Sequence, residues 1–289
     1  MENGNTNTPS PLRLILALIF LIVLPLALGL YLAPRLVPKP KVGIIRLNYD
    51  IFDQTAHLFN EQLAYARDDP AVKAVVIIIN SPGGSAAFSE EIYLSILDAR
   101  EELPVVATVD VLAASGGYYV AAAANEIYAK PTSNVGSIGV FGLLPGPVFI
   151  DEELLTTGPY KAFGGTADAA IRQAERSKFA FLEAIRVGRG ERLHVAPAVL
   201  ARAELFDGIQ ALEMGLIDGI RSNEEVFARA AELAGLADYE VVELFPLAFP
   251  DGGTLLAGYQ PEPLDLQRLW APPTDYPPGR HYRYMVPLR

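Results

Sequence analysis

Cysteine is absent from the 289 residues of this chain, and histidine occurs only three times. Without cysteine there is no disulfide, no thiol nucleophile and no zinc site built on sulfur. The histidines, at His57, His194 and His281, lack the His-Glu-x-x-His spacing of a zinc peptidase. The sequence therefore predicts no metal site and no cofactor.

The chain has fewer basic residues than acidic ones. The chain has 23 lysines and arginines against 34 aspartates and glutamates, which gives a net charge of −11. A surface of this sign repels polyanions, so nucleic acid is disfavoured as a partner. The length allows one sizeable α/β core with appendages.

One long segment, from Leu14 to Ala33, carries no charge and is bounded by Arg13 and Arg35. A helix of about 20 apolar residues crosses a bilayer, so we expect a single transmembrane anchor at 14–33. A cleaved signal peptide is the alternative, although its apolar region is usually only about 7–15 residues long. The basic residues that follow the segment favour a cytoplasmic domain by the positive-inside rule.

The rest of the chain divides by composition. Residues 1–13 are polar and predicted to be disordered, and the prolines of 34–41 indicate a short stiff linker. The folded domain is expected over 42–245, with a long helix over Ala167–Arg189 and a strand over Leu216–Ile220. The Pro-rich tail at 246–289 disfavours long helices and central strands; either it docks loosely, or its aromatic residues pack on a neighbouring subunit or near the substrate groove.

Ser115 lies in the most informative run of the chain. The strand-like run Val105–Val109 precedes it, Gly116 and Gly117 follow it, and the helix-forming run Val120–Ala124 comes next. This pattern predicts a strand–turn–helix junction with the hydroxyl at a helix N-terminus, where backbone N–H groups favour a developing anion. The alternative is a serine that only caps the helix.

A second glycine turn, Ser81–Gly84, follows the buried strand-like run Val75–Asn80 and precedes the helical spacing of Glu90–Leu97. Two successive units thus place a Gly-Gly pair at the carboxyl end of a strand, the edge at which open α/β sheets build their sites. The first turn can offer N–H donors to an oxyanion while the second offers the nucleophile. An ordinary tight turn is the alternative.

A serine nucleophile needs a base. None of the histidines occupies a glycine-framed or strand-end position, so a Ser-His-Asp triad has no support. A lysine serves as a base when burial disfavours its charged form. Lys161 lies in an apolar, glycine-framed stretch where Tyr160 and Phe163 can exclude water, whereas Lys130 and Lys178 are expected to be solvated.

Five runs of the sequence, taken together, carry a resemblance to a known family. They are Ser81–Gly84, Ala114–Tyr119, Val135–Val140, Gly158–Lys161 and Ala211–Asp218. In order and spacing these runs resemble the motifs of the signal peptide peptidase A family, and the similarity extends from about residue 42 to about residue 242. The resemblance implies a serine peptidase with a Ser-Lys dyad on the α/β fold shared with the Clp proteolytic subunit and the crotonases. That fold is a spiral of β-β-α units with helical extensions, here preceded by one transmembrane helix.

The resemblance also implies roles for single residues. Ser115 matches the nucleophile and Lys161 the general base and acid. Ser137 matches the serine that holds the lysine by a hydrogen bond, although it can equally be a turn serine between glycines. The Gly83 amide is the expected oxyanion donor, and the Gly116 amide is a second candidate.

For the whole protein, the resemblance implies an enzyme that hydrolyses short apolar peptides, such as signal-peptide remnants. Its catalytic domain would lie outside the cytoplasm, in conflict with the positive-inside rule. A ring-like homo-oligomer is also implied, in which the serine and lysine of one site come from adjacent subunits. The alternatives are a catalytically inactive membrane scaffold on the same fold and a crotonase-like acyl-CoA enzyme.

Overall fold

The computed structural model describes residues 11–36, 39–145, 157–158, 160–161 and 164–250. Predictions about the other residues lie outside this range. They concern the disorder of residues 1–10, His281, Phe163 and most of the Pro-rich tail. The domain boundaries drawn from composition stay predictions.

The N-terminal apolar segment is helical, and residues Ile15–Leu32 are long and apolar enough to cross a membrane. The helix continues beyond the expected end at Ala33 and takes in the first part of the expected linker. It comprises α1 (Pro11–Leu18), the π-helical turn η1 (Ile19–Val23) and α2 (Leu24–Leu36).

Eight strands form one sheet, whose main path runs β6-β5-β3-β2-β1-β8, while β4 pairs with β3 and β7 pairs with β4. Every pairing is parallel except that of β5 with β6. The strands are β1 (Lys41–Leu47), β2 (Val72–Ser81), β3 (Val105–Ala114), β4 (Glu126–Ala129), β5 (Asn134–Gly136), β6 (Leu205–Asp207), β7 (Gly219–Ile220) and β8 (Glu240–Glu243).

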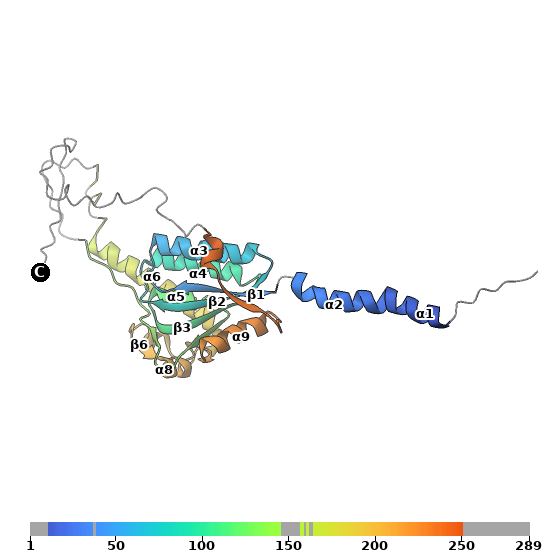
Figure 1. The fold of residues 1–289 in the computed structure, drawn as a ribbon. Coiled ribbons are helices and arrows are strands. Elements are labelled where there is room, and N and C mark those ends of the chain that lie inside the picture. Colours follow the sequence, from blue (N-terminus) through green and yellow to red (C-terminus); the bar gives the residue numbers. More distant parts are fainter. Residues whose placement is uncertain (1–10, 37–38, 146–156, 159, 162–163, 251–289) are drawn as a thin grey trace, which may run out of the picture. The chain divides into compact units, whose positions relative to one another are not determined.

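Helices cover both faces of the sheet, with α3 and α4 on one side and α9 on the other (Figure 1). This mixed α/β architecture confirms the predicted fold class. The helices of the domain are α3 (Asp53–Asp68), α4 (Ala86–Ala99), α5 (Gly116–Ala121), α6 (Ala167–Arg189), the 3-10 turn η2 (Gly190–Arg192), α7 (Pro197–Leu200), α8 (Gly208–Glu213), α9 (Asn223–Leu233) and α10 (Phe245–Ala248).

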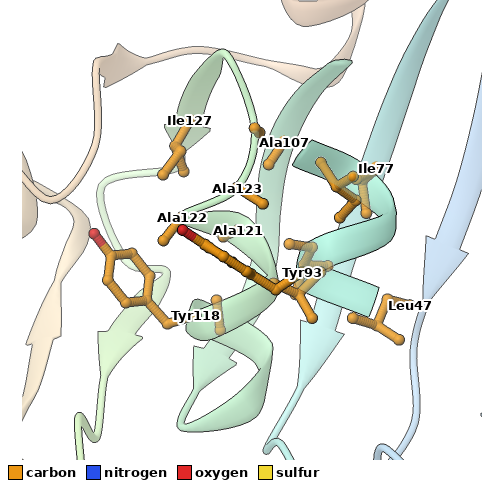
Figure 2. Packing of buried hydrophobic residues seen from close by; sticks show 14 of the residues in the cluster. Leu47, Ile77, Tyr93, Ala107, Tyr118, Ala121, Ala122, Ala123 and Ile127 are labelled. Carbon is orange, nitrogen blue, oxygen red and sulfur yellow. The ribbon is translucent and has the colours of Figure 1, made fainter. Parts of the chain in front are cut away.

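The larger core cluster lies on the α3/α4 side of the sheet. It includes Tyr118 and the run Val120–Ala124, which follow Ser115 in the sequence. Figure 2 shows the alanines Ala121–Ala123 among Ile77, Tyr93 and Tyr118. Small side chains let α5 approach the sheet closely, and Tyr118 is held there by a 2.7 Å hydrogen bond from its hydroxyl to the Leu216 carbonyl. The turn that carries Ser115 is therefore supported by a well-packed core.

The strand register brings the two glycine turns together. β2 and β3 are parallel neighbours, and Ser81 pairs with Ala113 at their carboxyl ends. Because both strands end at the same edge, Pro82–Gly84 and Ser115 leave the sheet side by side. This arrangement is the one predicted from the two Gly-Gly pairs.

One local prediction differs from the structure, and one strand pair was not predicted. The strand expected over Leu216–Ile220 is limited to Gly219–Ile220, because the Leu216 amide instead donates to the Ala211 carbonyl and closes α8. The antiparallel pair of β5 and β6 was not predicted. Each strand has only three residues, too few for a periodic pattern.

Candidate active site

Ser115 links the end of β3 to the start of α5 in a strained backbone conformation. Its φ is 51° and its ψ is −123°, a region that residues other than glycine rarely occupy. Such strain costs about 1–3 kcal/mol and persists only where the surroundings enforce it. The Ser115 amide donates to the Gly136 carbonyl at 2.9 Å, and its carbonyl accepts from the Tyr118 amide at 3.0 Å. The sequence predicted the junction but not the strain.

The Ser81–Gly84 turn packs directly against this junction. Gly83 has a φ of 92°, and a β-carbon on it would stand 2.9 Å from the Ser115 Cβ. Two hydrogen bonds of the buried Ser81 hydroxyl hold the turn in place. The hydroxyl donates to the Tyr49 carbonyl at 2.6 Å and accepts from the Gly83 amide at 3.1 Å. The Gly83 N–H is therefore occupied within the turn.

Ser137 lies on the side of Ser115 opposite the glycine turn, because β3 runs between β2 and β5. It follows β5, has a φ of 52°, and donates its amide to the Glu204 carbonyl at 2.8 Å. Its neighbour Gly136 supplies the carbonyl that binds the Ser115 amide. The structure thus brings together Ser115, Ser137 and the glycine turn, three of the predicted parts of the site.

Two cavities meet at Ser115. The first, of about 450 Å³, has an aromatic wall of Tyr119 and Phe181, whose ring centroids are 4.8 Å apart. The second, of about 740 Å³, is lined by both Ser115 and Ser137. Ser115, half-buried where the two cavities meet, can attack a bound acyl group that extends into either of them.

Charges lie at the edges of these cavities. Glu90 and Arg176 line the first cavity, and Asp50, Glu175 and Lys178 line the second. Burial and the nearby Glu90 carboxylate raise the pKa of Tyr119 to about 12. At neutral pH the Tyr119 hydroxyl therefore stays protonated and does not act as a base.

Lys161 is not among the described residues that line the two cavities at Ser115. It lies in an exposed turn, where its amide donates to the Gly158 carbonyl at 3.2 Å. Tyr160, expected to exclude water, has 49% of its surface exposed. The predicted dry setting is absent from the described part of one subunit.

The surroundings of Lys130 and Lys178 differ from those expected. Lys130 is expected to be solvated, but its ammonium binds Asp110 at 2.5 Å and Asn223 at 2.6 Å. Lys178, also expected to be solvated, lines the second cavity and pairs with Glu175 at 2.5 Å. The position of Lys178 could have been predicted from helical spacing. Lys178 lies three residues before the buried Phe181 and therefore shares the same face of α6.

The histidines offer no alternative base among the described residues. His57 is exposed and lies 3.9 Å from Glu61, a helical neighbour. The His194 amide donates to the Met214 carbonyl. Neither His57 nor His194 lines a cavity that contains Ser115.

Comparison with known proteins places this site in a family. The model of peptidase family S49 matches residues 98–237, and that of Clp protease matches residues 40–135. A Synechocystis protein named "Putative protease slr0021" is 33% identical over 61% of this chain and 68% of its own length. The chain belongs to peptidase family S49.

Other S49 relatives are longer than this chain. Protease 4 of Salmonella typhi is 31% identical over 62% of the chain, which spans 31% of that protein. The chloroplastic serine protease SPPA of Arabidopsis thaliana is 29% identical over 66% of the chain, which spans 30% of that protein.

Membership of S49 confirms the predicted family and the enzyme class, a serine peptidase. The Clp protease match and the central sheet confirm the predicted fold. The roles of the single site residues are argued below.

Proposed function

We propose that this chain is a membrane-anchored serine endopeptidase that hydrolyses short, extended, mostly apolar peptides, such as signal-peptide remnants, through a dyad of Ser115 and Lys161. The observation that carries the proposal is Ser115 itself, a strained serine held between two cavities in a chain of family S49. Strain of this kind is concentrated at functional sites.

In this mechanism an uncharged Lys161 takes the proton of the Ser115 hydroxyl while Oγ attacks the scissile carbonyl carbon. The tetrahedral intermediate collapses by breaking the C–N bond, and the Lys161 ammonium protonates the leaving amine. The acyl-enzyme ester is then hydrolysed by water, which Lys161 deprotonates in the same way. The cycle returns both residues to their starting protonation states.

The base of each site comes from a neighbouring subunit in this proposal. Lys161 is exposed in its own chain, while the second cavity holds Ser115 and Ser137 and has about 740 Å³ of space. A neighbour's Lys161 entering that cavity would lose water, and the Ser137 hydroxyl would accept a hydrogen bond from its ammonium or amine. A ring-like homo-oligomer supplies such neighbours.

The oxyanion is bound by backbone amides. Gly116 is the first residue of α5, so its N–H has no acceptor inside the helix. The Gly83 N–H, expected as the principal donor, already donates to Ser81 Oγ and must leave that bond to bind an oxyanion. The exposed Gly84, which lines both cavities, offers the next amide of the same turn. We therefore assign the oxyanion to Gly116, with Gly83 or Gly84 as the partner donor.

The substrate class follows from the first cavity and from the N-terminal helix. Tyr119, Phe181 and Val140 give that cavity an apolar wall suited to an aliphatic or aromatic side chain. A helix at Ile15–Leu32 that crosses the membrane would keep the domain close to peptides released there. We place the domain outside the cytoplasm. Protease added to intact cells should then digest it, whereas protection until lysis would place it inside.

Hydrolysis of quenched-fluorescent apolar peptides by the detergent-solubilised chain tests the proposal. Ser115→Ala and Lys161→Met should each lower kcat by about 10³-fold or more, because removal of one dyad member leaves only the binding groups. Lys178→Met is the matched control, since it removes a lysine that lines the Ser115 cavity and should retain most of the rate. A wild-type chain that hydrolyses no peptide would favour the membrane scaffold instead. A large loss in Lys178→Met alone would make Lys178 the base.

A further inference from the structure

Three residues other than glycine have a positive φ in the described part of the chain: Ser115 at 51°, Ser137 at 52° and Ala203 at 56°. All three line the same cavity of about 740 Å³. Two of them carry the hydroxyls of the proposed site, but Ala203 has only a methyl group and no chemistry of its own. Its strained backbone therefore needs another reason.

Backbone hydrogen bonds connect the three residues in a continuous path. The Ser115 amide donates to the Gly136 carbonyl at 2.9 Å, and the Ser137 amide donates to the Glu204 carbonyl at 2.8 Å. Gly136 and Ser137 thus bind the nucleophile on one side and the residue after Ala203 on the other. The antiparallel pairing of β5 with β6 fixes the register, with Gly136 opposite Leu205.

The turn that carries Ala203 packs tightly against this path. The Ala203 amide donates to the Leu200 carbonyl at 3.0 Å, which closes the turn after α7. A β-carbon on Gly136 would stand 2.4 Å from the Glu204 carbonyl oxygen, and one on Gly139 would stand 2.9 Å from the Ala203 Cβ. Any other backbone conformation at Ala203 would redirect the Glu204 carbonyl away from the Ser137 amide.

We propose that Ala203 is a positioning residue for catalysis. Its left-handed conformation aims the Glu204 carbonyl at the Ser137 amide, and the Gly136–Ser137 segment so held fixes the strained Ser115 and the Ser137 hydroxyl in the cavity. This inference rests on the proposed function, in which Ser115 and Ser137 take part in the reaction.

Two substitutions of nearly equal size separate the backbone from the side chain. Asparagine tolerates a positive φ, whereas the β-branched valine does not. Because Ala203 is exposed and lines the cavity, neither side chain enters the core, and the two variants add nearly the same bulk at the cavity wall. Ala203→Gly is a third variant, which keeps the positive φ without strain.

The measurements are kcat and KM on an apolar peptide, together with the labelling rate of Ser115 by a fluorophosphonate in folded chain. We expect Ala203→Asn and Ala203→Gly to keep kcat within about threefold, whereas Ala203→Val lowers kcat and the labelling rate by about tenfold or more with little change in KM.

Equal kcat values for Ala203→Val and Ala203→Asn would overturn the positioning role. So would a Val variant that is less stable but is labelled at the wild-type rate per folded chain, since that result indicates a structural role alone. Failure of the proposed function looks different: wild type and Ser115→Ala would then show the same rates of hydrolysis and labelling.

Discussion

The α-carbon of Gly83 lies against the backbone amide of Gly116, because a β-carbon on Gly83 would stand only 2.5 Å from the Gly116 nitrogen. The glycine turn and the turn that carries Ser115 are thus in direct contact, with no room for a side chain between them. The φ of Gly83, 92°, would also strain any other residue.

Gly83→Ala should therefore displace the Ser115 turn and lower kcat by about 10²-fold, the loss expected when a reacting group moves by about 1 Å. Gly142→Ala is the control, since nothing lies within 4 Å of a β-carbon there. Peptidase kinetics of the two purified variants give the comparison. Equal rates for both variants would show that the two turns do not depend on each other.

The strain at Ser115 predicts a difference in stability between two inactive variants. Ser115→Ala removes the hydroxyl but keeps the unfavourable φ of 51°, whereas Ser115→Gly removes both. We expect the free energy of unfolding of Ser115→Gly to exceed that of Ser115→Ala by about 1 kcal/mol, as measured by urea unfolding. A Gly variant that is less stable than the Ala variant would mean that the backbone at Ser115 is not strained.

A buried ion pair predicts how stability depends on pH. Arg189, with 1% of its side chain exposed, makes two hydrogen bonds of 2.8 and 2.9 Å to the Asp218 carboxylate. Burial alone would raise the pKa of Asp218, but the hydrogen bonds and charge of Arg189, together with the Ile127 amide and the charge of Arg192, lower it. A lowered pKa in the folded state stabilises the fold above the unfolded value of about 3.9, and this stabilisation is lost as the pH falls through the folded value.

Asp218→Asn should accordingly lower the free energy of unfolding by about 3–5 kcal/mol at pH 7, because it leaves the Arg189 charge buried without its partner. The difference from wild type should begin to shrink as the pH falls below the unfolded value of about 3.9, and it should disappear only below the lowered folded pKa, where wild-type Asp218 is protonated as well. Asp168→Asn, which breaks an exposed pair with Arg172, serves as the control and should have little effect at either pH. A difference that does not change with pH would contradict the assignment.

Much of the fold is predictable because its elements carry strong local patterns. The helix expected over Ala167–Arg189 coincides with α6, and the buried runs at Val75 and Val105 mark β2 and β3. The glycine pairs at the ends of these strands lie together at one edge of the sheet, as predicted. In each case the residues nearby in sequence determine the structure.

What the sequence could not reveal depends on distant contacts. Alanine favours the right-handed helical region, so nothing in the Arg202–Glu204 stretch indicates a positive φ at Ala203; packing against Gly136 and Gly139 enforces it. The occupied Gly83 amide likewise follows from the position of the Ser81 hydroxyl, which tertiary contact with Tyr49 determines. In the proposed mechanism the surroundings of Lys161 depend in turn on a neighbouring subunit, whose position does not follow from the local pattern of the sequence.

Mixing two inactive chains tests the central claim most directly. If each site takes Ser115 from one subunit and Lys161 from the next, co-assembly of equal amounts of Ser115→Ala and Lys161→Ala chains should restore about a quarter of the wild-type peptidase rate, since random neighbours pair the two intact residues that often. Either chain co-assembled with the double variant should stay inactive. A mixed particle with no peptidase activity, under conditions in which the wild-type particle is active, would contradict the shared dyad.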